Sequence, residues 1–310
     1  MGQTVDLLRR IRRYNITDLR RCVLFVGSGA SSAGVLPDGR GLPTWPEFAH
    51  HMIEDLALLG RINRTEENTL RAEVSIGHAQ SYLHVASVYK TKTDAPEFES
   101  FMVASLDPDG LRPSELHRSI AEVGFRAIVT TNFDRLLELT SPRMPTYAFP
   151  DFLGRRDILQ STETILLKLH GSIVPALNLK TRFVLSSEDY VRLHDNGDYQ
   201  EFLRSLILGS PVLVIGYSCR DPDFARIMTD LSSNHGVGPY VYVLLRRPEP
   251  ALCEAFRAQN LKVIPYEEHG EIPLLFEELV AGAGPRSAEL ARSKASRRNN
   301  INDFQFATMV

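Results

Sequence analysis

The chain has 310 residues, of which 43% are hydrophobic and 24% are charged, and its formal net charge is -3. This composition predicts a globular protein with room for one large domain or two modest ones. The near-neutral charge excludes a protein that coats nucleic acid through its bulk electrostatic field.

Cysteines are few: Cys22, Cys219 and Cys253, without a Cys-x-x-Cys pair. A structural zinc ribbon needs four ligands, usually in two close pairs, so we expect no zinc ribbon and no metal. An odd, sparse cysteine count suits a reducing compartment. The chain also shows no apolar run of membrane-spanning length and no secretory signal. We therefore expect a cytoplasmic protein without direct membrane contact.

A helix is predicted over 5–21, followed by a buried strand near 23–27. The strand runs directly into Gly27, Ser28, Gly29, Ala30 and Ser31. A continuous apolar run of this length is typical of a parallel strand buried on both faces. Glycines let the backbone turn tightly and approach a ligand, and turn amides beside a helix start favour phosphate. The motif is neither a P-loop nor a full dinucleotide fingerprint.

Residues 46–107 are predicted to be helical throughout, with no strand signal, which indicates a helical subdomain inserted between the first two strands. A loop rich in glycine and proline precedes it. We interpret Trp45 as packing the helix start rather than contacting a ligand. The four histidines of this block are interpreted as non-catalytic: His50, His51, His78 and His84.

Two further strands end in polar residues. After a helix over 114–123, a strand near 126–130 leads into Thr131, Asn132 and Asp134, and a strand near 165–169 leads into His170. Ligands of open parallel sheets bind at the carboxyl ends of strands, so these side chains are placed to touch one. Asn132 or Asp134 could instead cap the following helix. A histidine at this edge is a candidate general base.

The last part of the chain repeats the pattern. A strand near 211–215 precedes Gly216 and Ser218, and strands near 241–245 and 261–264 flank a helix over 250–259. A closing helix is predicted over 273–280. The sequence thus predicts an α/β, Rossmann-like, mostly parallel sheet with helices on both faces. We expect one catalytic domain over 1–285 and a basic tail over 286–310.

Taken in order, these strand ends resemble the sirtuin-like NAD-binding fold, and in particular its bacterial branch of NAD-cleaving antiphage effectors. That branch shares Gly-Tyr-Ser followed by Asp-Pro-Asp-Phe, here 216–224, and a Leu-Pro-Thr-Trp segment, here 42–45. The resemblance covers about residues 20–280. Sirtuin deacylases differ: Ser28 replaces an alanine, Thr131 replaces a glutamine, and the zinc ribbon that shapes their acyl-lysine cleft is missing.

The resemblance implies NAD as the substrate and a role for each motif. Asn132 would hold a water or a ribose hydroxyl, His170 would act as the base, and Asp134 would orient Asn132 or its loop. The diphosphate would lie against Gly27, Ser28, Gly29, Ala30 and Ser31, beside Thr131. Gly216 and Ser218 would bind the adenosine side.

The leading interpretation is an NAD glycohydrolase that depletes NAD in antiphage defence. The alternatives are a non-catalytic module that binds NAD or ADP-ribose, an NAD-dependent deacylase, and an unrelated nucleotide-binding α/β enzyme. An unchecked NAD hydrolase would kill its host, so we expect a homo-oligomer and a separate sensor protein. Family members encoded beside a HerA-type hexameric ATPase or a short argonaute suggest those partner classes, with nucleic acid bound only through the partner.

Overall fold

The structure is a computed structural model, and it describes residues 19–175, 177–217, 241–259 and 261–282. Ser218, the tail over 286–310 and most of the helix predicted over 5–21 lie outside the described residues. At the start of the described part, a short 3-10 helix, η1, spans Leu19–Arg21.

The core of the molecule is a seven-stranded sheet with the order β3-β4-β2-β1-β5-β6-β7, and every described pairing in it is parallel. The strands are β1 (Val23–Val26), β2 (Ala127–Thr130), β3 (Thr146–Ala148), β4 (Ile165–Lys168), β5 (Val212–Ile215), β6 (Val241–Arg246) and β7 (Leu261–Tyr266). Val26 lies opposite Thr130 on one side and Ile215 on the other. The central strands therefore end at the same level, and the turns that follow them meet there.

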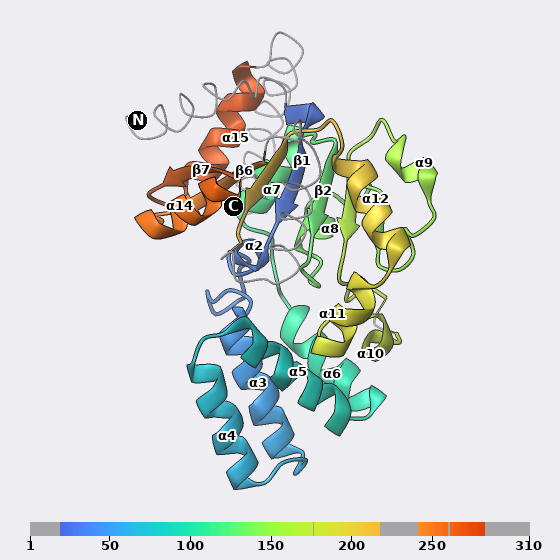
Figure 1. Cartoon of the computed structure of the whole chain (residues 1–310), viewed down its shortest axis with the longest axis vertical. Coiled ribbons are helices and arrows are strands. Elements are labelled where there is room, and N and C mark those ends of the chain that lie inside the picture. The colour runs from blue at the N-terminus through green and yellow to red at the C-terminus, as the bar shows by residue number, and fades with distance from the viewer. Residues whose placement is uncertain (1–18, 176, 218–240, 260, 283–310) are drawn as a thin grey trace, which may run out of the picture.

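Helices cover both faces of the sheet, as the sequence predicted (Figure 1). The helices are α2 (Ser28–Ser31), α3 (Trp45–Leu58), α4 (Arg64–Ser75), α5 (Ala79–Lys92), α6 (Ala95–Leu106), α7 (Glu115–Val123), α8 (Leu136–Thr140), α9 (Arg156–Leu159), α10 (Leu179–Arg182), α11 (Ser187–His194), α12 (Gly197–Ile207), α14 (Pro250–Ala258) and α15 (Glu271–Gly282). Side chains of β1 alternate between the faces, because Val23 and Phe25 pack with α12 whereas Leu24 and Val26 pack with α7 and α15. Burial on both faces explains why the strands read as continuous apolar runs.

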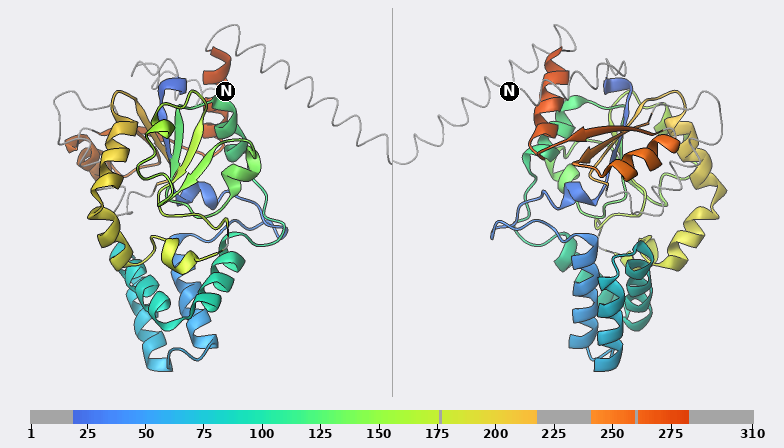
Figure 2. Two further views of the ribbon diagram at one scale, coloured as in Figure 1. Left: turned by 90° about the vertical axis from the view of Figure 1, so that its right-hand side faces the viewer. Right: turned by 60° about the vertical axis from the view of Figure 1, so that its left-hand side comes forward.

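Helices α3 to α6 form a block at one end of the molecule, beyond the carboxyl ends of the strands (Figures 1 and 2). Their apolar faces surround a separate core that also takes in Phe133, Phe183 and Leu185 from the sheet part of the chain. A buried ion pair between Lys90 Nζ and Asp189 Oδ2, 2.6 Å long, ties α5 to α11. The block is thus fixed to the segment that follows His170.

Two features differ from the sequence prediction. β3 lies between the strands predicted near 126–130 and 165–169, where no strand was predicted, and it adds an edge strand beside β4. Helix α11 forms a separate turn before α12, and Ser186 caps it by accepting from Asp189 N. Among the helices that the structure describes, none is long and apolar enough to cross a bilayer.

Candidate functional site

The glycine turn after β1 packs directly against the turn after β5. Gly29 N donates to Gly216 O at 2.8 Å, and a Cβ at Gly27 would lie 2.6 Å from that same oxygen. Gly216 itself has φ of +69°, and a Cβ there would meet Ala30 N at 2.9 Å. Glycine is therefore required at these positions by packing within the protein, because the two strand-end turns approach each other more closely than side chains allow. The sequence analysis had attributed these glycines to a tight turn and to the close approach of a ligand.

Asn132 is fixed to the glycine turn by its side-chain amide. Its Nδ2 donates to Gly27 O at 2.9 Å, and its backbone N donates to Thr130 Oγ1 at 3.0 Å. The amide nitrogen is thereby occupied, which leaves Oδ1 as an acceptor with no hydrogen bond from the rest of the described chain. The neighbouring Thr131 is buried, with its hydroxyl 3.3 Å from Tyr217 OH.

Asp134 joins the turn after β2 to α2 and to the start of α8. Its Oδ2 accepts from Ser31 Oγ at 2.5 Å, and its Oδ1 accepts from Leu136 N at 3.0 Å. The carboxylate therefore serves as a helix-start acceptor and as a link to the glycine turn at once. The sequence had treated the cap and the functional role as alternatives.

A fully buried lysine at the end of β4 supports the turn that follows β2. Lys168, the last residue of β4, donates to Phe133 O at 3.1 Å, to Asp134 O, and to Glu138 Oε1 at 2.7 Å. All three acceptors belong to the 133–138 segment, so this cation holds the backbone on either side of the Asp134 side chain. The sequence analysis did not identify Lys168 as a site residue, although it is the one charged residue inside an apolar strand.

His170 follows β4 and is 1% exposed. Its ring packs edge-on to Tyr190 of α11, with ring centroids 5.1 Å apart, and its Nδ1 lies 3.5 Å from Tyr190 OH. Phe133, which stacks on Phe183 at 4.3 Å, lies on another side of the imidazole. The imidazole is therefore oriented by aromatic neighbours.

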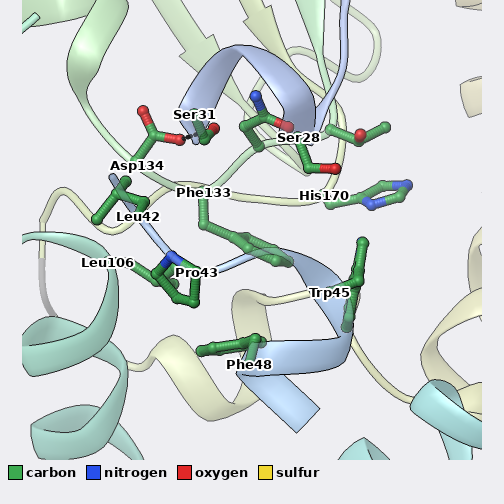
Figure 3. Close-up of a pocket in the computed structure, with 12 residues that line it drawn as sticks. Ser28, Ser31, Leu42, Pro43, Trp45, Phe48, Leu106, Phe133, Asp134 and His170 are labelled. Carbon is green, nitrogen blue, oxygen red and sulfur yellow. Dashed lines mark hydrogen bonds between the residues drawn. The ribbon is translucent and has the colours of Figure 1, made fainter. Parts of the chain in front are cut away.

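These residues share one cavity (Figure 3). Its polar half consists of Ser28, Ser31, Thr131, Asn132, Asp134 and His170, and its apolar half of Leu42, Pro43, Trp45, Phe48, Leu106 and Phe133. In Figure 3 the Ser31–Asp134 pair lies opposite the Trp45 and Phe48 rings. A cavity with one polar and one apolar wall suits a flat, partly polar ligand group.

A larger cavity continues from the first, and both include Ser28 and Trp45 in their walls. Gly29, Gly216 and Tyr217 line it at the glycine turn, and residues of β6 and β7 line it further along. A ligand that bends around the glycine turn can therefore occupy both cavities.

The structure brings most of the predicted site residues together. Six of the predicted residues line the first cavity, and Ser28, Gly29 and Gly216 line the second. Gly27 and Ala30 lie in neither wall, since both are packed behind the turn. Trp45 packs on Phe48 at 6.1 Å, as predicted, but it also lines both cavities, which sequence reasoning had not favoured.

The parallel sheet, with helices on both faces, defines an α/β protein of the Rossmann type. Residues 126–264 match the family model described as the SIR2-like domain. This match spans β2 to β7 and includes Asn132, Asp134, His170 and Gly216. This part of the chain is therefore similar to the SIR2-like domain, as its motifs indicated.

Two curated relatives carry the name NAD(+) hydrolase ThsA. The protein from Enterococcus faecium is 29% identical over 127 residues, which are 39% of this chain and 25% of that protein. The protein from Cytobacillus dafuensis is 22% identical over 211 residues, which are 66% of this chain and 37% of that protein. The chain thus aligns with well under half of the length of each relative.

Proposed function

We propose that this chain is an NAD glycohydrolase, which cleaves the nicotinamide–ribose bond of NAD with water. The observation that carries the proposal is the convergence of Asn132, Asp134 and His170 on one cavity whose opposite wall is apolar and aromatic. The SIR2-like match and the names of the two relatives support NAD as the substrate.

Nicotinamide is a good leaving group, so it needs little help from the protein to depart. Nicotinamide carries a positive charge in NAD, so the carbon–nitrogen bond breaks with its electron pair going to the ring nitrogen. The ribose passes through a cation spread over its ring, as in other glycoside hydrolyses. The site must hold the ribose, keep stray nucleophiles away and position one water.

Each residue takes a role that fits its environment. Asn132 offers Oδ1 to a water or a ribose hydroxyl, since Gly27 O occupies its Nδ2. His170 accepts the proton that the water loses as it attacks the ribose carbon. Asp134 keeps the loop in place through Ser31 and Leu136 N. The nicotinamide ring fits the aromatic wall at Phe133, Trp45 and Phe48.

The rest of the dinucleotide follows the second cavity. The diphosphate lies against the turn at Ser28 and Gly29, and the adenosine lies toward Gly216. Ser218, the second residue expected there, lies outside the described part of the chain.

The test compares nicotinamide release from NAD by the wild type, Asn132→Ala and His170→Ala. Loss of a positioned base costs about 10²–10⁴-fold in rate, which is the loss expected for His170→Ala. Asn132→Ala should also lose most turnover, because the water or ribose hydroxyl loses its acceptor, and both variants should keep the thermal unfolding midpoint of the wild type. The control is His84→Ala, which removes an exposed histidine paired with Glu73 on the helical block. Unchanged release by folded His170→Ala removes this residue from the mechanism, and NAD binding without any product favours a binding module.

In the cell, this activity would deplete NAD as an antiphage effector. We propose that the chain acts in the cytoplasm as a homo-oligomer and that a separate protein senses infection, with a HerA-type hexameric ATPase or a short argonaute as the partner class. This part of the proposal rests on the family resemblance.

A further inference from the structure

The larger cavity extends over the carboxyl ends of three strands that carry none of the residues assigned to bond cleavage. Its walls include Gly216 after β5, Arg246 at the end of β6, and Tyr266 at the end of β7. His269, just beyond β7, completes this part of the wall. In Rossmann-type sheets, the carboxyl ends of strands are where nucleotides bind.

Arg246 contacts His269, and this contact defines which ring nitrogen of the histidine carries the proton. Arg246 Nη1 lies 3.0 Å from His269 Nε2, and Tyr266 OH lies 3.2 Å from His269 Nδ1. A guanidinium has only donors, so Nε2 must accept and the ring proton is on Nδ1, facing the tyrosine. Burial, together with the nearby Arg246 charge, lowers the pKa of His269 against an opposing effect of Glu268, which fits this neutral ring.

The positive charge of Arg246 is not neutralised within the described residues, where its guanidinium meets no carboxylate. The adjacent Arg247 differs, because it pairs with Glu267 at 3.1 Å and also with Glu268. The described residues that line the larger cavity include no aspartate or glutamate. Among the described residues, this part of the cavity therefore presents the guanidinium of Arg246 without a carboxylate partner, beside apolar walls at Leu245 and Leu252.

We propose that Arg246 is a subsite for a phosphate on the adenosine ribose, so that the chain takes the 2′-phosphorylated dinucleotide NADP as well as NAD. The inference rests on the proposed function, because that function places the adenosine half in this cavity. A carboxylate at such a position selects a free 2′-hydroxyl, whereas an arginine accommodates a 2′-phosphate. A guanidinium fork also matches the geometry of phosphate oxygens.

The test uses two ligands that the enzyme cannot cleave. Calorimetry on the full chain would compare adenosine 2′,5′-bisphosphate with 5′-AMP for the wild type, Arg246→Gln and the control Arg247→Gln. A hydrogen bond to a charged group contributes about 1.5–3 kcal/mol, so the wild type should bind the bisphosphate at least about tenfold more tightly. Arg246→Gln should abolish this preference and leave 5′-AMP binding unchanged, while Arg247→Gln keeps the preference.

Four results would overturn the subsite: equal wild-type affinity for the two ligands, no binding of either, equal weakening of both by Arg246→Gln, or loss of the preference in Arg247→Gln. Turnover of NAD and NADP is measured in parallel. Absence of cleavage with a preserved binding preference refutes the proposed function alone. Cleavage of NAD without any preference for the bisphosphate refutes the subsite alone.

Discussion

At the scale of single residues, the two glycine turns of the site approach each other more closely than a Cβ at Gly216 would allow. Both Gly216 and Gly209 have positive φ, +69° and +76°, but a Cβ at Gly216 would meet Ala30 N at 2.9 Å, whereas one at Gly209 meets nothing within 4 Å. Gly209→Ala should therefore cost only the backbone strain, about 1–2 kcal/mol. Gly216→Ala should cost about 1–3 kcal/mol more, because the turns must separate. Urea unfolding measures both, and equal losses would show that the close approach is unimportant.

A second prediction at this scale concerns His117, which is 2% exposed on α7 near Asp134. Burial lowers the pKa of His117, an effect to which Arg118 adds and which the Asp134 charge opposes. The unfolded chain then takes up the proton more readily, so folding stability should fall as the pH drops below about 6.5 and through the lowered pKa.

The variant His117→Gln tests how much the titration of His117 contributes to the pH dependence of folding stability. His117 accepts from Ser114 N in a capping box, and glutamine can take that position without titrating. The variant should show a smaller loss of thermal stability than the wild type between pH 7 and pH 5. His51→Gln, at an exposed position on α3, serves as the control. A pH profile of His117→Gln that matches the wild type would contradict the assignment.

At the scale of elements, the sequence predicted the strands that carry the site, because each is a continuous apolar run that ends in small or polar residues. It could not predict β3, since three residues between prolines carry no usable periodicity. It also could not place β5 beside β1, because strand order depends on contacts across the whole chain. The pairing of Ser31 with Asp134 depends on that order and was likewise outside local patterns.

Lys168 links β4 to the turn after β2, and we predict that it positions the site. Lys168→Met removes a buried cation from two backbone carbonyls and from Glu138, so it should destabilise the protein by about 3–5 kcal/mol. Nicotinamide release should also fall, because the Asp134 backbone loses its support. Chemical denaturation and turnover at a temperature where the variant stays folded measure these effects.

The matched control is Lys92→Met, which removes an ion pair with Glu66. The Lys92 side chain is 34% exposed and the Glu66 side chain is 42% exposed. A partly exposed pair of this kind contributes about 0–1 kcal/mol. If the folded Lys168→Met variant keeps full turnover, the residue is structural and does not position the catalytic loop.

At the scale of the whole molecule, the helical block contributes to the site as well as to the fold. Trp45, Phe48 and Leu106 come from α3 and α6 and form much of the apolar wall of the first cavity. Tyr82 and Leu83 of α5 line the second cavity. The sequence predicted these helices, but which of their side chains line the two cavities depends on the way the block is placed over the sheet.

Regulation by assembly is a prediction at the same scale. The purified chain should form a homo-oligomer, and its NAD turnover should change when the partner is added. Light scattering coupled to gel filtration gives the mass, and turnover is compared with and without a co-expressed neighbour. A monomer with full activity that no neighbour changes would contradict this prediction.

We expect this chain to hydrolyse NAD without a protein substrate. The most direct measurement incubates the wild type with NAD alone in water enriched in heavy oxygen and analyses the products by mass spectrometry. We predict equal amounts of nicotinamide and ADP-ribose, with one heavy oxygen on the ribose carbon that held nicotinamide. Intact NAD, or nicotinamide released only when an acetyl-lysine peptide is present, would contradict this expectation.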